Sequence, residues 1–153
     1  KIKITKETNY EELSDQMSEL GAKLILDTLK LIENKRADFI EQNESEATYA
    51  KKIEKTETKI NWNDDAEKIV AKINAFSPNP GCWFELSGNR VKIIKAKKVI
   101  GEGIPGTILK DKFTIACSKN AIQIIELQKE GKQKIKADDF LKGNKIKIGQ
   151  SLN

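Results

Sequence analysis

The second half of the chain alternates short apolar runs with turn residues, and this spacing constrains its fold more than any other feature. Residues 83–86 run into Ser87-Gly88-Asn89, which is a hairpin signal, and the run at 91–100 is rich in β-branched residues and lysine. About five short strands at this spacing predict a small barrel or sandwich, with an OB-like β-barrel as the best match. The other expected strands cover residues 107–109, 113–117, 122–127 and 146–148.

A helix is expected in front of these strands. Asp64 and Glu67 form an N-terminal capping signature, and Asp65 suits the positive end of a helix. Residues 78–81, PNPG, end the helix because proline lacks a backbone donor and glycine permits positive φ. A further helical turn is expected at 137–141. The apolar stripe of the helix consists of Ala66, Ile69, Val70, Ile73 and Phe76.

The N-terminal segment has a different periodicity. Ile2 and Ile4 alternate with lysines and predict the end of an edge strand. Thr8 and Glu11 fit a capping box at the start of a helix over residues 9–33. A lone strand and helix cannot bury an apolar face, so the segment is expected to be the tail of a larger α/β domain. The apolar face of this helix includes Leu13, Met17, Leu20 and Leu24.

The stretch between these two parts is polar and charged. Residues 41–46 are acidic and rich in amides, and lysines then alternate with glutamates up to residue 59, which is typical of a linker. The chain begins at Lys1 and holds Met17 as its only methionine, which favours a fragment whose chemistry lies upstream. The sequence therefore predicts an α+β chain in three parts: a domain tail (1–42), a linker (43–60) and a barrel domain with a helix in front (61–153).

The residue types that usually carry catalysis are scarce. The sequence has no histidine, which removes the usual general base, the commonest metal ligand and every imidazole-dependent triad. Cys82 and Cys117 lie among apolar neighbours and are interpreted as buried thiols. The adjacent carboxylates at 64–65 and 138–139 stand where helices begin, so helix caps are favoured over a metal or catalytic pair. We expect no catalytic residue and no metal site in the chain.

Two other features have competing interpretations. The G-E-G at 101–103 lacks the lysine and hydroxyl residue of a phosphate loop and is expected to be a turn. Trp62 and Trp83 could each stack on a nucleic-acid base, although a core or interdomain contact is favoured for both.

The positive charge is concentrated in the second half. Residues 1–60 hold 11 basic and 13 acidic side chains, a net −2, whereas residues 61–153 hold 17 and 10, a net +7. This asymmetry indicates a polyanionic partner, although the lysine bias of an AT-rich genome would also produce it. Lysines bind phosphates as point charges, so binding should follow a nucleic-acid backbone and weaken with salt. A barrel would gather as one basic surface the lysines of two expected strands: Lys92, Lys95, Lys97, Lys98, Lys129, Lys132, Lys134 and Lys136.

The strings TYAKKI at 48–53, INW at 60–62 and AFSPNPGCW at 75–83 together resemble the C-terminal part of the methionyl-tRNA formyltransferase family. Residues 48–53, TYAKKI, are similar to its T-Y-A-x-K-I/L segment, and residues 60–62, INW, to the I-D-W that opens its second domain. Residues 75–83, AFSPNPGCW, resemble its A-F-N-P-W-P-G-A-W signature. The remaining matches follow in the family's order, as PGTIL at 105–109, LQKEGK at 127–132 and DFL at 139–141. The resemblance runs from the first helix to near the end of the chain.

This resemblance implies a division of labour. Family members join a Rossmann-like formyltransferase domain to an OB-like C-terminal domain, and they transfer a formyl group from 10-formyltetrahydrofolate to the methionine of initiator methionyl-tRNA. Their catalytic residues and folate site lie in the first domain, so residues 1–42 would be its last strand and helix, and this chain alone would be inactive. The expected partners are initiator methionyl-tRNA and the chain's own N-terminal catalytic domain, in a monomeric cytoplasmic protein without membrane contact.

The resemblance and the charge together assign a tRNA-holding role to the linker and barrel. Two alternatives remain: the C-terminal subdomain of a formyltransferase that acts on nucleotide sugars or hydrolyses formyltetrahydrofolate, and a non-catalytic scaffold barrel. A flat titration with initiator tRNA would favour the first, and mixed charge on every face would favour the second. The candidate tRNA-binding residues are Lys51, Lys52, Lys55, Lys59, Lys92, Lys95, Lys97, Lys98, Lys132 and Lys134.

Overall fold

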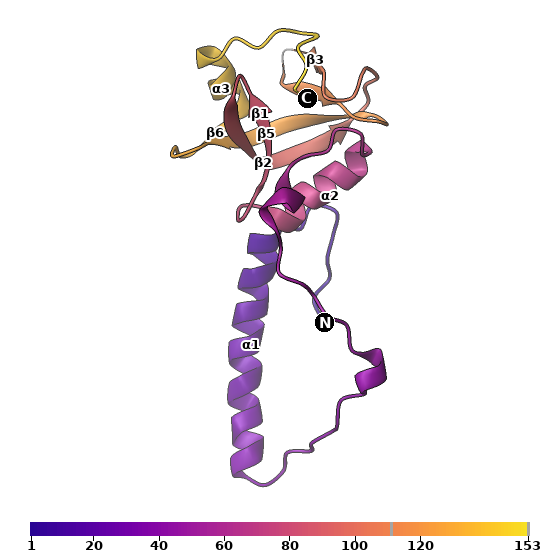
Figure 1. The fold of residues 1–153 in the computed structure, drawn as a ribbon. Coiled ribbons are helices and arrows are strands. Elements are labelled where there is room, and N and C mark those ends of the chain that lie inside the picture. The colour runs from indigo at the N-terminus through magenta and orange to yellow at the C-terminus, as the bar shows by residue number, and fades with distance from the viewer. Residues whose placement is uncertain (111, 153) are drawn as a thin grey trace.

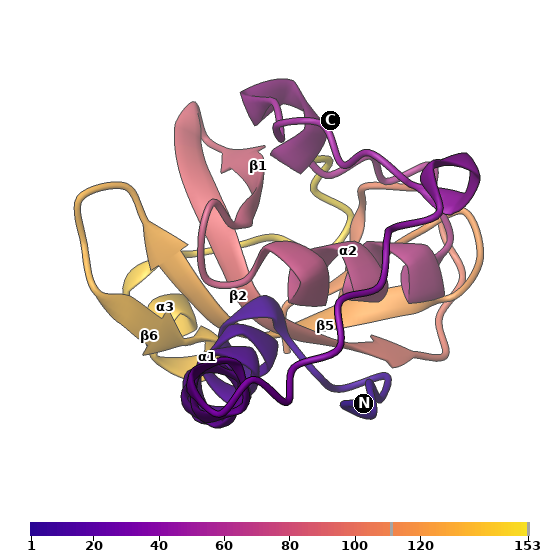
Figure 2. The ribbon, with the colours of Figure 1, turned by 90° about the horizontal axis from the view of Figure 1, so that it is seen from below.

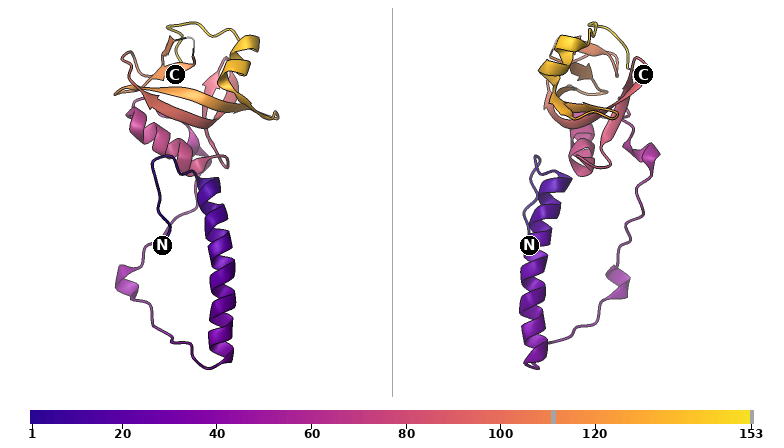
Figure 3. Two further views of the ribbon diagram at one scale, coloured as in Figure 1. Left: turned by 180° about the vertical axis from the view of Figure 1, so that it is seen from behind. Right: turned by 90° about the vertical axis from the view of Figure 1, so that its left-hand side faces the viewer.

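The computed structural model describes residues 1–110 and 112–152, and it consists of a long helix and a compact part that contains the sheet (Figure 1). Helix α1, Tyr10–Glu33, projects away from the sheet, and an extended segment brings the chain back to it. In both views of Figure 3, no other described element lies along most of the length of α1. Mixed helices and an antiparallel sheet confirm the α+β class.

The capping box of α1 lies one residue later than the sequence predicted. The Oδ1 of Asn9 accepts from the backbone N–H of Glu12 at 2.9 Å, and the Glu12 side chain accepts from the Asn9 N–H at 3.4 Å. The predicted pair of Thr8 and Glu11 is wrong because the Thr8 hydroxyl accepts from the Thr5 N–H at 3.0 Å, in the turn before the helix. No residue of α1 is buried, and its apolar stripe beyond the partly buried Leu13 faces solvent.

The edge strand predicted at Ile2 and Ile4 is also wrong. Residues 1–9 contain a turn and no strand. A strand needs a neighbour to pair with its backbone N–H and C=O groups, and none of the six strands described pairs with this segment. The N-terminal segment is instead held by side chains, since the Asn74 amide donates to the Lys6 carbonyl at 3.0 Å.

The segment between α1 and α2 holds two short 3-10 helices, η1 (Glu44–Glu46) and η2 (Lys55–Thr58). The chain after η2 runs beside strand β1, Cys82–Leu86, where the Ile60 N–H donates to the Trp83 carbonyl at 2.8 Å. Thr58 and Ile60 are buried. These contacts fix η2 against the sheet.

Helix α2, Ala66–Phe76, forms where the sequence predicted it. Asp65 is the N-cap and accepts from the Lys68 N–H at 2.8 Å, so the predicted capping signature of Asp64 and Glu67 is wrong by one residue, and Glu67 lies in the first turn. Ala66, Ile69 and Ile73 are buried, which confirms the apolar stripe. Viewed from below, α2 crosses the sheet over β2 and β5, so the stripe closes one side of the core (Figure 2).

The sheet has six strands, all paired antiparallel, in the order β1-β2-β5-β4-β3, with β6 also paired to β5. Ser87 and Gly88 both have positive φ, 51° and 76°, which suits the tight hairpin turn between β1 and β2. A last helix, α3 (Ala137–Gly143), follows β6. The other strands are β2 (Asn89–Val99), β3 (Ile108–Lys110), β4 (Thr114–Ala116), β5 (Ala121–Lys129) and β6 (Lys134–Lys136).

The last strand predicted at residues 146–148 is wrong. The Gly149 N–H donates to the Ile108 carbonyl at 2.7 Å, and the Ile108 N–H donates to the Gln150 carbonyl at 3.0 Å. The chain therefore bonds to β3, but it turns at Gly149, whose φ is 82°, so it does not stay extended. Ile148 faces solvent, and only an isolated bridge joins Ser151 to Thr107.

Aromatic rings run through the core of the sheet. Phe84 meets Phe113 edge-on with centroids 6.0 Å apart, and Phe113 stacks on Phe140 of α3 at 5.7 Å. Trp62 meets Phe84 edge-on at 5.8 Å and is buried, so its predicted core contact is confirmed. None of the helices in the described part of the chain combines the length and apolar character needed to cross a membrane.

Candidate nucleic-acid interface

The hairpin of β1 and β2 has one face in the core and one face toward solvent. Cys82, Phe84 and Leu86 are buried on β1, whereas the alternate residue Trp83 is only partly buried. Because side chains alternate along a strand, the outer face of β1 carries Trp83. On β2 the buried Val91 likewise alternates with residues on the outer face, so Trp83 lies opposite Lys92 and diagonal to Arg90.

Trp83 is the centre of a cation–π cluster. The Arg90 guanidinium carbon lies 3.9 Å from the centroid of the Trp83 ring, and the Lys59 ammonium lies 5.2 Å from it. The indole N–H donates to the Thr58 hydroxyl at 3.1 Å, which fixes the ring in its plane. Lys59 also pairs with Glu85 at 3.8 Å. Cations over an aromatic face are attracted by its quadrupole, so the cluster gathers positive charge on the hairpin.

A half-open cleft of about 330 Å³ adjoins this cluster. Its wall combines η2, the β1–β2 hairpin and the turn after β5, which are far apart in the sequence. Four of its lining residues are basic and one, Glu130, is acidic. The lining residues are Lys55, Thr58, Pro80, Gly81, Trp83, Arg90, Lys92, Gln128, Lys129, Glu130 and Gly131.

Lys92 is held in the cleft by its stem as well as its ammonium. The ammonium donates to the Pro78 carbonyl at 3.3 Å and to the Asn79 side-chain oxygen at 3.5 Å. The aliphatic stem passes over Gly81, where an added Cβ would lie 2.3 Å from the Lys92 Cδ. Gly81 also has φ of 81°, so glycine is needed there for both the backbone and the close approach.

Gly81→Ala is therefore expected to move Lys92 and to destabilise the fold by roughly 1–3 kcal/mol through backbone strain. Gly88→Ala is the matched control, because Gly88 has φ of 76° and nothing within 4 Å of an added Cβ. Both variants should lower the melting temperature, and only Gly81→Ala should also weaken nucleic-acid binding. Equal binding by the two variants would contradict this role of Gly81.

A row of polar side chains extends the cleft across four strands. Trp83 of β1 pairs with Lys92 of β2, Lys92 with Gln128 of β5, and Gln128 with Lys134 of β6. Directly paired residues project to the same face of a sheet. The Gln128 amide donates to the Lys132 carbonyl at 2.7 Å, which holds the β5–β6 turn beside this row. Lys92, Lys132 and Lys134 therefore belong to one side of the molecule.

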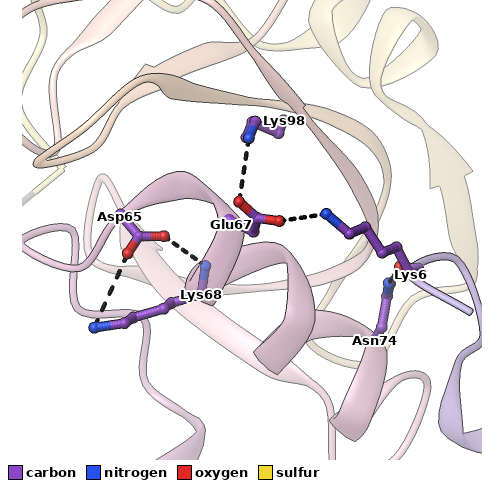
Figure 4. Close-up of polar contacts among 6 residues, drawn as sticks. All are labelled: Lys6, Asp65, Glu67, Lys68, Asn74 and Lys98. Atoms are coloured by element: carbon purple, nitrogen blue, oxygen red, sulfur yellow. Dashed lines mark hydrogen bonds and ion pairs between the residues drawn. The ribbon is translucent and has the colours of Figure 1, made fainter.

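The remaining β2 lysines lie at a different groove. Lys95, Lys97 and Lys98 line a half-open hollow of about 840 Å³ between β2, α2 and the N-terminal segment. Lys98 pairs with Glu67 at 3.3 Å, and Glu67 also pairs with Lys6 at 2.7 Å (Figure 4). The hydrogen bond from Lys6 lowers the pKa of the Glu67 carboxyl, and the same bond raises the pKa of Lys6. A carboxylate thus offsets the charge of Lys98.

Several sequence candidates lie outside the cleft. Lys51 and Lys52 are exposed on the irregular segment before η2 and are not among the residues that line either hollow. The Lys129 side chain contributes to the cleft wall, but its ammonium donates to the Asn144 side chain at 2.6 Å and lies over the Phe140 ring. Of the ten candidate lysines, the structure gathers Lys55, Lys59 and Lys92 around Trp83.

Arg90 is the functional candidate that sequence reasoning missed. It is one of only two arginines, the other being Arg36, in a chain whose basic residues are otherwise lysine. Its position after the Ser87-Gly88 turn places it on the same face as Trp83, and strand alternation could have shown this. The contact with Trp83 itself depends on the hairpin register.

The groups considered for catalysis have structural roles. Both thiols are buried, as predicted, and burial raises the pKa of Cys82 and of Cys117 to about 11. Asp139 pairs with Lys142 at 2.6 Å in the first turn of α3, so the predicted cap at this pair is wrong; the cap position is Lys136. Within residues 1–110 and 112–152, no group of acidic residues and cysteines is arranged to hold a metal ion.

The raised thiol pKa values predict a pH dependence of stability. The folded state holds the thiol protons more tightly than the unfolded chain, so this contribution is complete below the ordinary pKa of 9.0 and is lost as the pH rises toward 11. The free energy of unfolding, measured with urea, should therefore fall across this interval. The double variant Cys82→Ala/Cys117→Ala keeps every lysine but lacks both thiols, so its free energy of unfolding should fall less over the same pH interval. An equal decline in the free energy of unfolding of the two proteins would show that the thiols do not cause it.

A family model described as "Formyl transferase, C-terminal domain" matches residues 52–145, which include every residue that lines the cleft. The chain belongs to the formyl transferase C-terminal domain family. This confirms the resemblance predicted from the sequence strings.

This formyl transferase C-terminal domain is similar to proteins named methionyl-tRNA formyltransferase. It is 40% identical to the protein of Bradyrhizobium diazoefficiens, covering 97% of this chain and 49% of that protein. It is 37% identical to the protein of Pelagibacter ubique, covering 99% of this chain and 49% of that protein. The chain spans about half the length of the curated relatives it matches.

Solved structures share the fold of this formyl transferase C-terminal domain. A variant of HypX from Aquifex aeolicus superposes with a TM-score of 0.69 at 20% identity, covering 92% of this chain and 27% of that one. HypX in complex with tetrahydrofolic acid superposes with a TM-score of 0.58 at 23% identity, covering 74% of this chain and 22% of that one. At these identities the likeness shows the fold alone.

Proposed function

We propose that this chain is the tRNA-holding C-terminal portion of a methionyl-tRNA formyltransferase, a monomeric cytoplasmic enzyme. The enzyme transfers a formyl group from 10-formyltetrahydrofolate to the methionine of initiator methionyl-tRNA. The names of the relatives support the substrate, and the family membership supports the position of the chain within the enzyme.

The observation that carries the proposal is the cationic and aromatic cleft between η2 and the β1–β2 hairpin. Lys55, Arg90 and Lys92 converge on it, beside the half-buried ring of Trp83. A nucleic-acid backbone is a regular line of negative charges, and contacts from basic side chains to its phosphates supply most of the sequence-independent affinity. The row from Lys92 to Lys134 extends this basic surface across the sheet.

The proposal assigns no step of formyl transfer to this chain. The sequence has no histidine, and both thiols are buried with their pKa raised to about 11, so neither residue type offers a reactive group at neutral pH. Accordingly, 10-formyltetrahydrofolate and the groups that act on it belong to the N-terminal catalytic domain. The residues of this chain would hold and orient the tRNA.

The finer architecture is part of the same proposal. Residues 1–42 are proposed as the end of a Rossmann-like domain, residues 43–60 as a linker, and residues 61–153 as an OB-like barrel. The unburied apolar side chains of α1, including Met17, Leu24 and Leu29, support contact with the N-terminal catalytic domain. A sheet of short antiparallel strands that binds nucleic acid on its outer face is compatible with the OB-like assignment.

The test is equilibrium binding of initiator tRNA to the chain and to two matched double variants. Lys55→Ala/Lys134→Ala removes two exposed cations from the proposed surface, whereas Lys23→Ala/Lys30→Ala removes two exposed cations from α1. The first should weaken binding at least about thirtyfold, since each of the two lost contacts to a charged group contributes about 1 kcal/mol or more. The second should leave affinity unchanged. Equal affinities of the two variants, or no binding by the unmodified chain, would overturn the proposal.

A further inference from the structure

The Arg90 guanidinium lies over the Trp83 ring beside the cleft. Both side chains lie on the outer face of the hairpin, and Arg90 is exposed at the edge of the cleft. Within the described chain, Arg90 has no carboxylate within ion-pair distance; Glu85, its cross-strand neighbour, pairs with Lys59. The guanidinium carbon lies 3.9 Å from the centroid of the indole, and because Arg90 is exposed, its side away from the ring is available to a ligand.

The pair is held in place from beneath. Trp83 donates through its indole N–H to Thr58 at 3.1 Å, and the buried Thr58 donates through its hydroxyl to the Lys55 carbonyl at 2.8 Å. The Trp83 carbonyl accepts from the Ile60 N–H at 2.8 Å. These hydrogen bonds connect the indole to η2 and hold it in place, and the guanidinium lies on the indole. A ligand meets a surface that is already arranged, which lowers the entropic cost of binding.

The residue type at position 90 is itself informative. A guanidinium is planar and can stack on a ring with one face while it presents the other, whereas a lysine ammonium is a hydrated point charge. Every other basic residue of this sheet is a lysine, whereas the residue over the indole, at 3.9 Å, is an arginine. Its presence at this position indicates that the planar guanidinium matters as well as the positive charge. RNA-binding proteins commonly stack unpaired bases on aromatic rings or on arginine guanidinium planes.

The cleft beside the pair has the size and charge for one nucleotide. Its volume of about 330 Å³ lies at the lower end of small-ligand sites, which span roughly 300–1,000 Å³. Lys55 and Lys92 line the same cleft and supply positive charge for a phosphate, while Gln128 adds a polar side chain to the wall. A duplex hides the faces of its bases in the stack, so only an unpaired base can use the guanidinium plane.

We propose that the cleft binds one unpaired nucleotide of the RNA ligand, with its base stacked on the outer face of Arg90 and its phosphate between Lys55 and Lys92. This inference rests on the proposed function, because it requires an RNA ligand. It adds that this site distinguishes single-stranded from paired RNA, which lysines on the sheet alone would not do. The base contact is through stacking, so the site tolerates different bases.

The test compares a short single-stranded RNA with a duplex of the same sequence, using the chain and two conservative variants. Arg90→Lys keeps the charge and removes the stacking plane; Arg36→Lys makes the same change beyond the end of α1 and is the control. Affinity is measured by titration, and quenching of tryptophan fluorescence reports base stacking near Trp83, since Trp62 is buried. Arg90 is exposed, so a thermal melt should confirm an unchanged fold.

Arg90→Lys should lower the single-strand affinity about tenfold, within the range measured for stacking of one base, and should reduce the fluorescence quenching. Its duplex affinity and the affinities of Arg36→Lys should stay within about twofold of the unmodified chain. An unchanged single-strand affinity in Arg90→Lys, or an equal loss for both RNAs, would overturn the inference. The proposed function would survive that result if the unmodified chain still bound initiator tRNA; no tRNA binding by the unmodified chain would overturn both.

Discussion

Phe113→Ala is expected to destabilise the domain by about 3–5 kcal/mol, the cost of emptying a large aromatic site in a packed core. Phe113 is fully buried, and its ring joins Phe84 on one side to Phe140 of α3 on the other. Removal of the ring leaves a cavity between the sheet and α3, because backbone hydrogen bonds hold the surrounding strands in register. Chemical denaturation followed by near-ultraviolet circular dichroism would measure the loss.

The control is Phe39→Ala, which removes the same side chain from a residue that is 84% exposed. Its free energy of unfolding should stay within about 0.5 kcal/mol of the unmodified chain. If Phe113→Ala proved equally mild, the described core would be incorrect at its centre.

Affinity for initiator tRNA is expected to fall about sixtyfold between about 50 mM and about 200 mM salt, if roughly four phosphates are contacted. Each phosphate that a basic side chain neutralises releases condensed counterions, and the slope of log K against log[salt] should be close to about −3. The four cations that best fit such contacts are Lys55, Lys92, Lys132 and Lys134.

The slope also identifies which cations contribute. Lys55→Ala/Lys134→Ala should reduce its magnitude by roughly two, because each lost phosphate contact removes about one unit. Lys95→Ala/Lys98→Ala should reduce it less, since Glu67 already offsets the charge of Lys98 at 3.3 Å. A flat salt dependence, or the larger change in the second variant, would contradict the proposed surface.

The local pattern of the sequence was sufficient for much of the fold. Helix α2 forms where Asp65 can cap it and where Ile69 and Ile73 recur at helical spacing. The β1–β2 hairpin follows from Ser87 and Gly88, which accept the positive φ of the tight turn. The buried thiols and the Trp62 core contact were also predicted. The α2 cap and the hairpin turn depend on residues close together in the chain.

The candidate site was predicted in part. Lysine content indicated a basic surface on the sheet, and Lys55 and Lys92 do line one cleft. Charge alone could not show that Glu67 pairs with Lys98, because the two residues meet only when α2 packs on β2. Nor could it show that Lys129 is directed toward Asn144. Partners distant in the chain decide which cations remain available.

The sequence by itself determined the helices, the hairpin, the buried stripe of α2 and the family, because these depend on short-range periodicity, turn chemistry and the order of motifs. Only the tertiary structure decided that Ile2 and Ile4 have no strand to pair with, that the chain turns at Gly149, and that Arg90 stacks on Trp83 beside Lys55. Strand pairing and ion pairing need two partners in space. A sequence lists the candidates, whereas the register and packing of the folded chain select which of them meet.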